Sequence, residues 1–115
     1  MVLLDEALTA IVNFIDDSVD KGQMGTGGTA SASSDTGLEY PDAATLFATT
    51  SSISDNQVVF TYIKPSTTGA GTTYREYEYQ DSVNAVNFTR YVFTPLEASA
   101  SEDWNIKVRI FVRNV

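Results

Sequence analysis

The chain has 115 residues, of which 43% are hydrophobic, so it is long and apolar enough to form one globular domain with its own core. It has neither cysteine nor histidine, which excludes disulfides, zinc sites built on these residues and any mechanism that needs a histidine acid or base. A net charge of −8, from 15 acidic and 7 basic residues, repels a phosphate backbone, and we expect no nucleic-acid partner.

Residues 1–20 have the spacing of an amphipathic helix. Five apolar residues lie on one stripe because they recur every three or four positions: Leu4, Leu8, Ile11, Ile15 and Val19. The stripe must be covered either by the chain's own sheet or by a neighbouring copy, and we expect it to be an interface. Asp5 and Glu6 stand where a secretory signal carries basic residues, and the apolar stretch is too short to span a bilayer, so no membrane insertion is expected.

Residues 21–37 are rich in glycine, serine and threonine and contain almost no large apolar side chain. This composition predicts an extended connector, long enough to hold the helix far from the sheet or on another subunit. Its glycines at 25, 27 and 28 match neither a dinucleotide fingerprint nor a P-loop, because the segment follows a helix and lacks the required spacing. No cofactor is expected.

From residue 38 the hydrophobic pattern changes to the period of two that is typical of strands. We expect five antiparallel strands, at 45–53, 57–64, 74–80, 88–94 and from Trp104 onward. Pro65 and Pro95 should end the second and fourth strands, because proline cannot donate to a ladder. The prediction is a single, mainly β domain with a helix at 1–20, a connector at 21–37 and a small antiparallel β-sandwich at 38–115.

The last strand carries a stripe of basic residues on its outward face. Lys107, Arg109 and Arg113 should point away from the apolar face that begins with Trp104. On an acidic chain this stripe fits the acidic surface of another copy or of a neighbouring protein, where charge pairs set register and partner choice. The alternative is that these side chains only protect an edge strand from aggregation.

Four tyrosines gather on two of the predicted strands: Tyr74, Tyr77, Tyr79 and Tyr91. Such residues suit a protein interface and could also stack on a sugar ring, which would make the chain a glycan-binding module for receptor recognition. The alternative is ordinary cross-strand packing. We prefer packing or a subunit interface to glycan binding.

Two groups of carboxylates invite a catalytic or metal-binding interpretation. Glu76 and Glu78 lie two apart on one strand face, near the separation used by glycosidases, but we expect this pair to face water. Asp16, Asp17 and Asp20 lack the spacing of an EF-hand loop, and a solvated helix face is the better interpretation. We expect no catalytic residue and no metal site.

Four stretches, taken in their order along the chain, resemble a family of small virion structural proteins from tailed phages and archaeal tailed viruses. They are GTGGTASASSDTGLE at 25–39, PSTTGAGTTYRE at 65–76, NFTRYVFT at 87–94 and the terminal strand from Trp104. The resemblance covers nearly the whole chain and depends on the order of these parts. It implies a non-enzymatic particle component of the tail, the baseplate or a fibre anchor, assembled in the host cytoplasm.

We therefore expect the chain to act through a closed homo-oligomer and through contacts with neighbouring virion proteins. A capsid turret or decoration protein is the nearest alternative. A module that binds a cell-surface glycan is the alternative from a different functional class, and an enzyme is remote.

Overall fold

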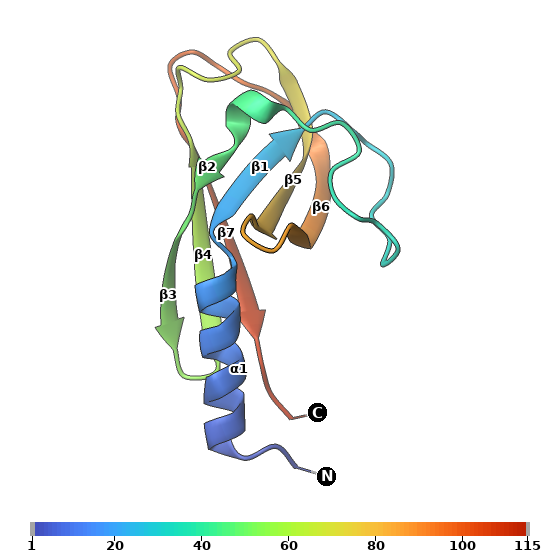
Figure 1. The fold of residues 1–115 in the computed structure, drawn as a ribbon. Coiled ribbons are helices and arrows are strands. Elements are labelled where there is room, and N and C mark those ends of the chain that lie inside the picture. The colour runs from blue at the N-terminus through green and yellow to red at the C-terminus, as the bar shows by residue number, and fades with distance from the viewer. Residues whose placement is uncertain (1, 115) are drawn as a thin grey trace.

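The computed structural model describes residues 2–114 and consists of one N-terminal helix followed by two antiparallel sheets (Figure 1). The helix α1 spans Asp5–Ser18 and a short 3-10 helix, η1, spans Ala43–Thr45. The strands are β1 (Lys21–Gly25), β2 (Phe47–Ala48), β3 (Thr50–Ser54), β4 (Gln57–Lys64), β5 (Thr73–Asp81), β6 (Val86–Glu97) and β7 (Trp104–Phe111). The predicted fold class, mainly β with one N-terminal helix, is confirmed, although seven strands form instead of about five.

The two sheets differ in size. The larger has the order β2-β1-β5-β6 and the smaller the order β3-β4-β7, so β6 and β7 are edge strands. The smaller sheet is the longer one along the molecule, because β4 and β7 pair without interruption from Gln57 with Phe111 to Lys64 with Trp104. The larger sheet covers one end of it and α1 covers the other (Figure 1).

The first part of the predicted connector is a strand, and this prediction was wrong. Residues 21–25 form β1 in the interior of the larger sheet, between β2 and β5. The glycines permit close packing: a Cβ on Gly22 would lie 2.6 Å from the ring of Tyr62, and one on Gly25 would lie 2.5 Å from the carbonyl oxygen of Tyr40. Only Val19 and Asp20 separate α1 from β1, so the helix is held against the chain's own sheets.

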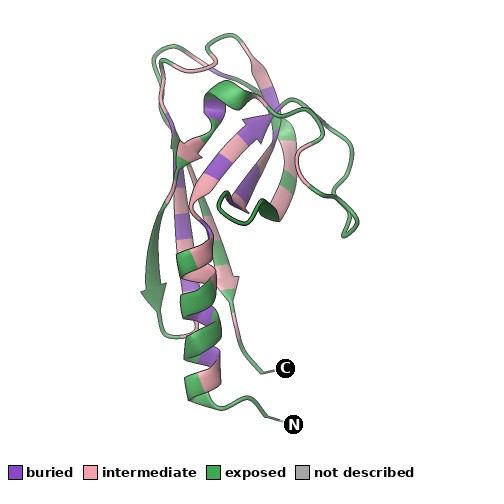
Figure 2. Ribbon diagram, in the orientation of Figure 1, coloured by how far each residue is buried: buried purple, intermediate pink, exposed green. Residues whose placement is uncertain are grey.

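The buried side of α1 is rotated away from the predicted stripe. Leu8, Val12 and Val19 are buried, and Val12 lies outside that stripe. Leu4 and Ile11 are exposed and Ile15 is half-buried. The helix packs on β3 and β4, and Figure 2 shows an exposed face along the rest of its length. The chain's own sheet therefore covers only part of the predicted stripe.

Two other strand boundaries differ from the prediction. β6 continues through Pro95 to Glu97, which an edge strand permits because a residue without an N–H can face outward there. The weak strand expected at 45–53 is divided into η1, β2 and β3. The strand expected at 57–64 coincides with β4, whose alternating burial places Val58, Phe60 and Tyr62 in the core.

Candidate functional site

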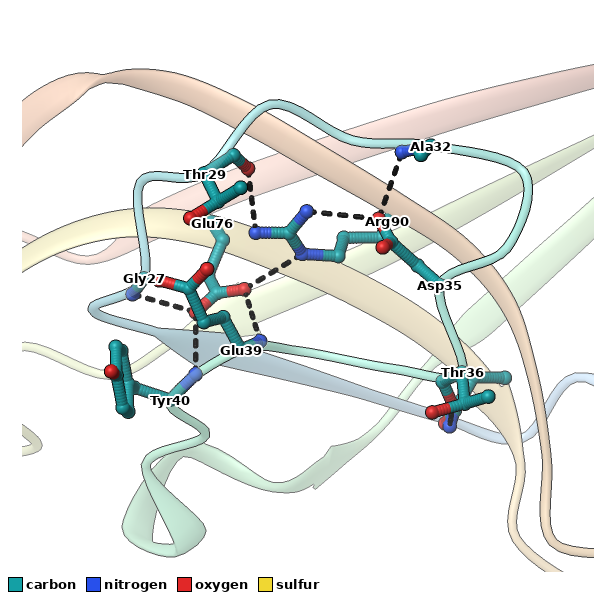
Figure 3. A network of polar contacts seen from close by, with 10 residues as sticks. Gly27, Thr29, Ala32, Asp35, Thr36, Glu39, Tyr40, Glu76 and Arg90 are labelled. Atoms are coloured by element: carbon teal, nitrogen blue, oxygen red, sulfur yellow. Dashed lines mark hydrogen bonds and ion pairs between the residues drawn. The ribbon is translucent and has the colours of Figure 1, made fainter.

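A loop of residues 26–42 folds over the face of the larger sheet that carries Glu76 and Arg90 (Figure 3). The buried Glu76 carboxylate accepts backbone N–H hydrogen bonds from Gly27 at 2.6 Å, Glu39 at 2.8 Å and Tyr40 at 3.0 Å. These bonds tie both ends of the loop to the middle of β5. The rest of the predicted connector is therefore an ordered cover.

Arg90, on β6, completes this network. Its Nε donates to Glu76 Oε1 at 2.9 Å, while its terminal nitrogens reach Asp35 Oδ2 at 3.0 Å and the carbonyl oxygen of Thr29 at 2.9 Å. Burial alone would raise the pKa of Glu76, but the backbone N–H groups and Arg90 outweigh it, and the pKa lies below its usual value. Glu76 is thus an ionised anchor for the loop.

Glu78 lies two residues further along β5, and it is buried too, so the expectation that the pair faces water was wrong. Its Oε2 has no hydrogen-bond partner among the described residues, and its Oε1 accepts a bond from Gln80 at 3.2 Å. Burial raises the pKa of Glu78 to about 7, and the charge of Glu76 adds to the effect. With exposed fractions of 0% and 4%, neither carboxyl is accessible to a substrate in this conformation.

The four tyrosines do not form one exposed surface. Tyr74 and Tyr79 are buried: the Tyr74 hydroxyl donates to Asp42 Oδ2 at 2.7 Å, and the Tyr79 hydroxyl donates to the carbonyl oxygen of Ile106 at 2.7 Å. Tyr77 is half-buried and its ring lies 5.5 Å from that of Tyr91, the one exposed member. Two of the four rings are therefore closed to a sugar, and the glycan-binding interpretation of this cluster is not retained.

The basic stripe lies where the sequence places it. Lys107, Arg109 and Arg113 are exposed, while Trp104 and the alternate residues of β7 are half-buried. Both ion pairs found within residues 2–114 belong to Arg90, so the stripe is not neutralised by the described part of the chain.

The exposed side of α1 and its N-cap carry a ridge of apolar residues, which we call the α1 ridge: Leu4 at the N-cap, the half-buried Ala7, Ile11 and Phe14. The intervals of three, four and three residues are those of a coiled-coil seam. Leu4 and Phe14 are 71% and 67% exposed. The predicted stripe thus contributes two residues to this ridge, Leu4 and Ile11, and loses Leu8 and Val19 to the core.

A cleft of about 380 Å³ opens between the edges of the two sheets. Its apolar lining comes from both of them: Met24, Tyr77, Phe93, Leu96, Trp104 and Ile106. The sequence did not predict this cleft, because the periodicity of each strand does not indicate how the two sheets pack against each other.

The acidic end of α1 has a structural role at one position. Asp20 accepts hydrogen bonds from the backbone N–H of Ser82 at 2.8 Å and from its hydroxyl at 2.5 Å, and these bonds lower the pKa of Asp20.

No group of three potential metal ligands occurs among residues 2–114. Within the same residues, no helix is both long and apolar enough to cross a membrane.

Sequence reasoning also missed the Glu76–Arg90 network. The available signal was a lone arginine on a β strand near a strand glutamate, which many sheets contain. The position of residues 27, 39 and 40 above Glu76 is a product of the fold alone.

No family model, curated protein or solved structure matches the chain significantly.

Proposed function

We propose that this chain is a non-enzymatic structural subunit of a tailed virus particle and that it acts by assembling with copies of itself. The resemblance of its ordered Gly/Thr-rich and strand segments to small virion proteins supports this class. Within the particle we favour the tail, as a baseplate component or an anchor for fibres. A capsid turret or decoration protein is the second placement.

The observation that carries the proposal is the α1 ridge. Ile11 and Phe14 lie on the exposed face of α1, and Leu4 at the N-cap continues their line at the spacing with which two helices pack. Burial of a side chain of this size contributes about 1.5–3 kcal/mol when it is complete. Contact between ridges of symmetry-related copies would therefore stabilise a closed oligomer.

Light scattering of the purified protein tests this step. We expect a defined oligomer for the natural chain and a monomer for the double variant Ile11→Asp and Phe14→Asp, with the β signal in circular dichroism unchanged. The control is Thr9→Asp and Asn13→Asp, which adds the same charge to exposed positions on the other side of α1. A natural chain that stays monomeric at every protein and salt concentration contradicts the proposal.

The place in the particle needs a separate experiment. Antibodies against this chain should label the tail of intact particles released from cells that carry its coding sequence. Label over the head would favour the turret or decoration placement. Particles without label would contradict the assignment to the virion.

A further inference from the structure

We infer that the free edge of β7 is a docking site for an extended segment of another protein, which adds a fourth strand to the smaller sheet. The larger sheet has four strands and the smaller has three. β2 lies against β4, and the edge strands β6 and β7 both line the cleft between the sheets. A strand added beside β7 would lie against the apolar side chains of β5 and β6 that line this cleft.

Residues of β6 show that this position is incomplete. Tyr91 pairs with Tyr77 and therefore points to the same face, toward the smaller sheet, yet it is 56% exposed. Leu96 lines the cleft and is 54% exposed. These side chains face the space that a fourth strand would fill.

The inner face of β7 gives independent evidence. On the neighbouring β4, the inward residues Val58 and Phe60 are fully buried. Their partners in the register, Ile110 and Val108, are only half-buried, as are Ile106 and Trp104. β4 has a strand on each side and α1 packed against it, whereas β7 has a strand on one side only. Apolar side chains of an added strand would complete this face.

The outward face of β7 sets the charge of the occupant. Lys107 and Arg109 are exposed and form no ion pair within residues 2–114. Basic residues can protect an edge from unwanted pairing, but protection does not explain the half-covered apolar side of the same strand. Directly opposite residues in adjacent strands are close enough to pair, so the added strand should alternate acidic and apolar residues.

The occupant is a segment of another polypeptide. Within residues 2–114 the segments of alternating pattern already lie in the seven strands, and the 26–42 loop is tied down by Glu76 and Arg90. The inference does not depend on the proposed function, because it concerns an edge that is separate from the α1 ridge.

A synthetic peptide of alternating valine and glutamate, blocked at both ends, is the probe. We expect saturable binding that changes the fluorescence of Trp104, the only tryptophan of the chain, which lines the cleft. Slowed amide hydrogen exchange on β7 should accompany the change. A valine–lysine peptide, and a valine–glutamate peptide with N-methyl groups along one edge, should not bind.

A charge-reversal variant tests the charge specificity of the site. Lys107→Glu with Arg109→Glu should weaken binding of the glutamate peptide by about tenfold or more and should allow the lysine peptide to bind. Because the lysine peptide is gained, a misfolded variant would be recognised by its failure to bind either peptide. The control Lys21→Glu with Arg75→Glu makes the same change in net charge away from β7 and should bind as the natural chain does.

Two results would overturn the inference. One is a natural chain whose Trp104 fluorescence and β7 exchange respond to neither peptide. The other is dissociation of a homo-oligomer by the β7 variant, which would make a second copy the occupant. Failure of the proposed function has a different signature: a monomer that still binds the glutamate peptide.

Discussion

Glu76 and Glu78 lie two residues apart on β5, both are buried beneath the 26–42 loop, and their pKa values are displaced in opposite directions. The difference is one of hydrogen bonding. Glu76 receives three backbone N–H groups and Arg90, whereas one oxygen of Glu78 has no partner among the described residues. The loop is thus held by one charged carboxylate and lies over a second carboxyl that stays protonated up to about pH 7.

Glu78 should make the stability of the fold decrease with rising pH. Because its pKa is about 7 in the folded state and near 4.5 when unfolded, the folded chain holds a proton through that window. Its contribution is complete below about pH 4.5 and is lost as the pH rises through about 7, and a shift of this size is worth roughly 3 kcal/mol. Urea unfolding at pH 5 and pH 8 gives the free energy of unfolding of the natural chain and of Glu78→Gln, and the natural chain should lose more stability between the two pH values. Equal pH dependence in both proteins would contradict the assignment.

Removal of the Glu76 carboxylate should release the loop. Glu76→Ala leaves three backbone N–H groups without their acceptor and removes the buried partner of Arg90, which keeps its contacts with Asp35 and Thr29, and we expect a loss of about 3–5 kcal/mol in the free energy of unfolding. Amide hydrogen exchange at Gly27, Glu39 and Tyr40 should accelerate. Glu97→Ala, at an exposed position of β6, is the control and should change neither quantity. Unchanged exchange in Glu76→Ala would show that the loop is held by other contacts.

Gly22 should not tolerate a side chain. A Cβ there would lie 2.6 Å from Tyr62 Cδ2 and 3.3 Å from the carbonyl oxygen of Glu78, so Gly22→Ala should cost about 1–3 kcal/mol through overpacking. At Gly28 the nearest atom, the flexible Arg75 Cδ, lies at 3.4 Å, and Gly28→Ala should be nearly neutral. Thermal unfolding of the two variants compares them. Equal melting temperatures of the two variants would contradict the close packing of Gly22 against Tyr62.

Leu4 and Leu8 have the same side chain on the same predicted stripe but should differ in their effect on stability. Leu8 is 3% exposed, and Leu8→Ala should cost about 2–5 kcal/mol. Leu4→Ala, at an exposed position, should change the free energy of unfolding by no more than about 0.5 kcal/mol. Chemical unfolding at a protein concentration where the chain is monomeric gives both values. A large effect at Leu4 in the monomer would contradict the orientation of α1.

Local periodicity predicted a large part of the fold. β4 coincides with the predicted 57–64 strand, and the alternation from Trp104 onward correctly separates the half-buried face of β7 from Lys107 and Arg109. Both strands could be predicted because a strand with one face on a core has apolar residues at alternate positions. Among the site residues, the basic stripe was therefore the part that the sequence located.

The tertiary structure decided the rest, because it depends on contacts between distant segments. Gly22 and Gly25 have the composition of a connector, but close approach of Tyr62 and Tyr40 makes them part of a strand. Glu76 has the local pattern of an exposed residue, but residues 36 to 49 positions away bring their N–H groups to it. The sequence by itself determined the class of fold and the faces of its clearest strands. Which glycines pack, which carboxyls are buried and which edge remains open are set by long-range packing, which no local period encodes.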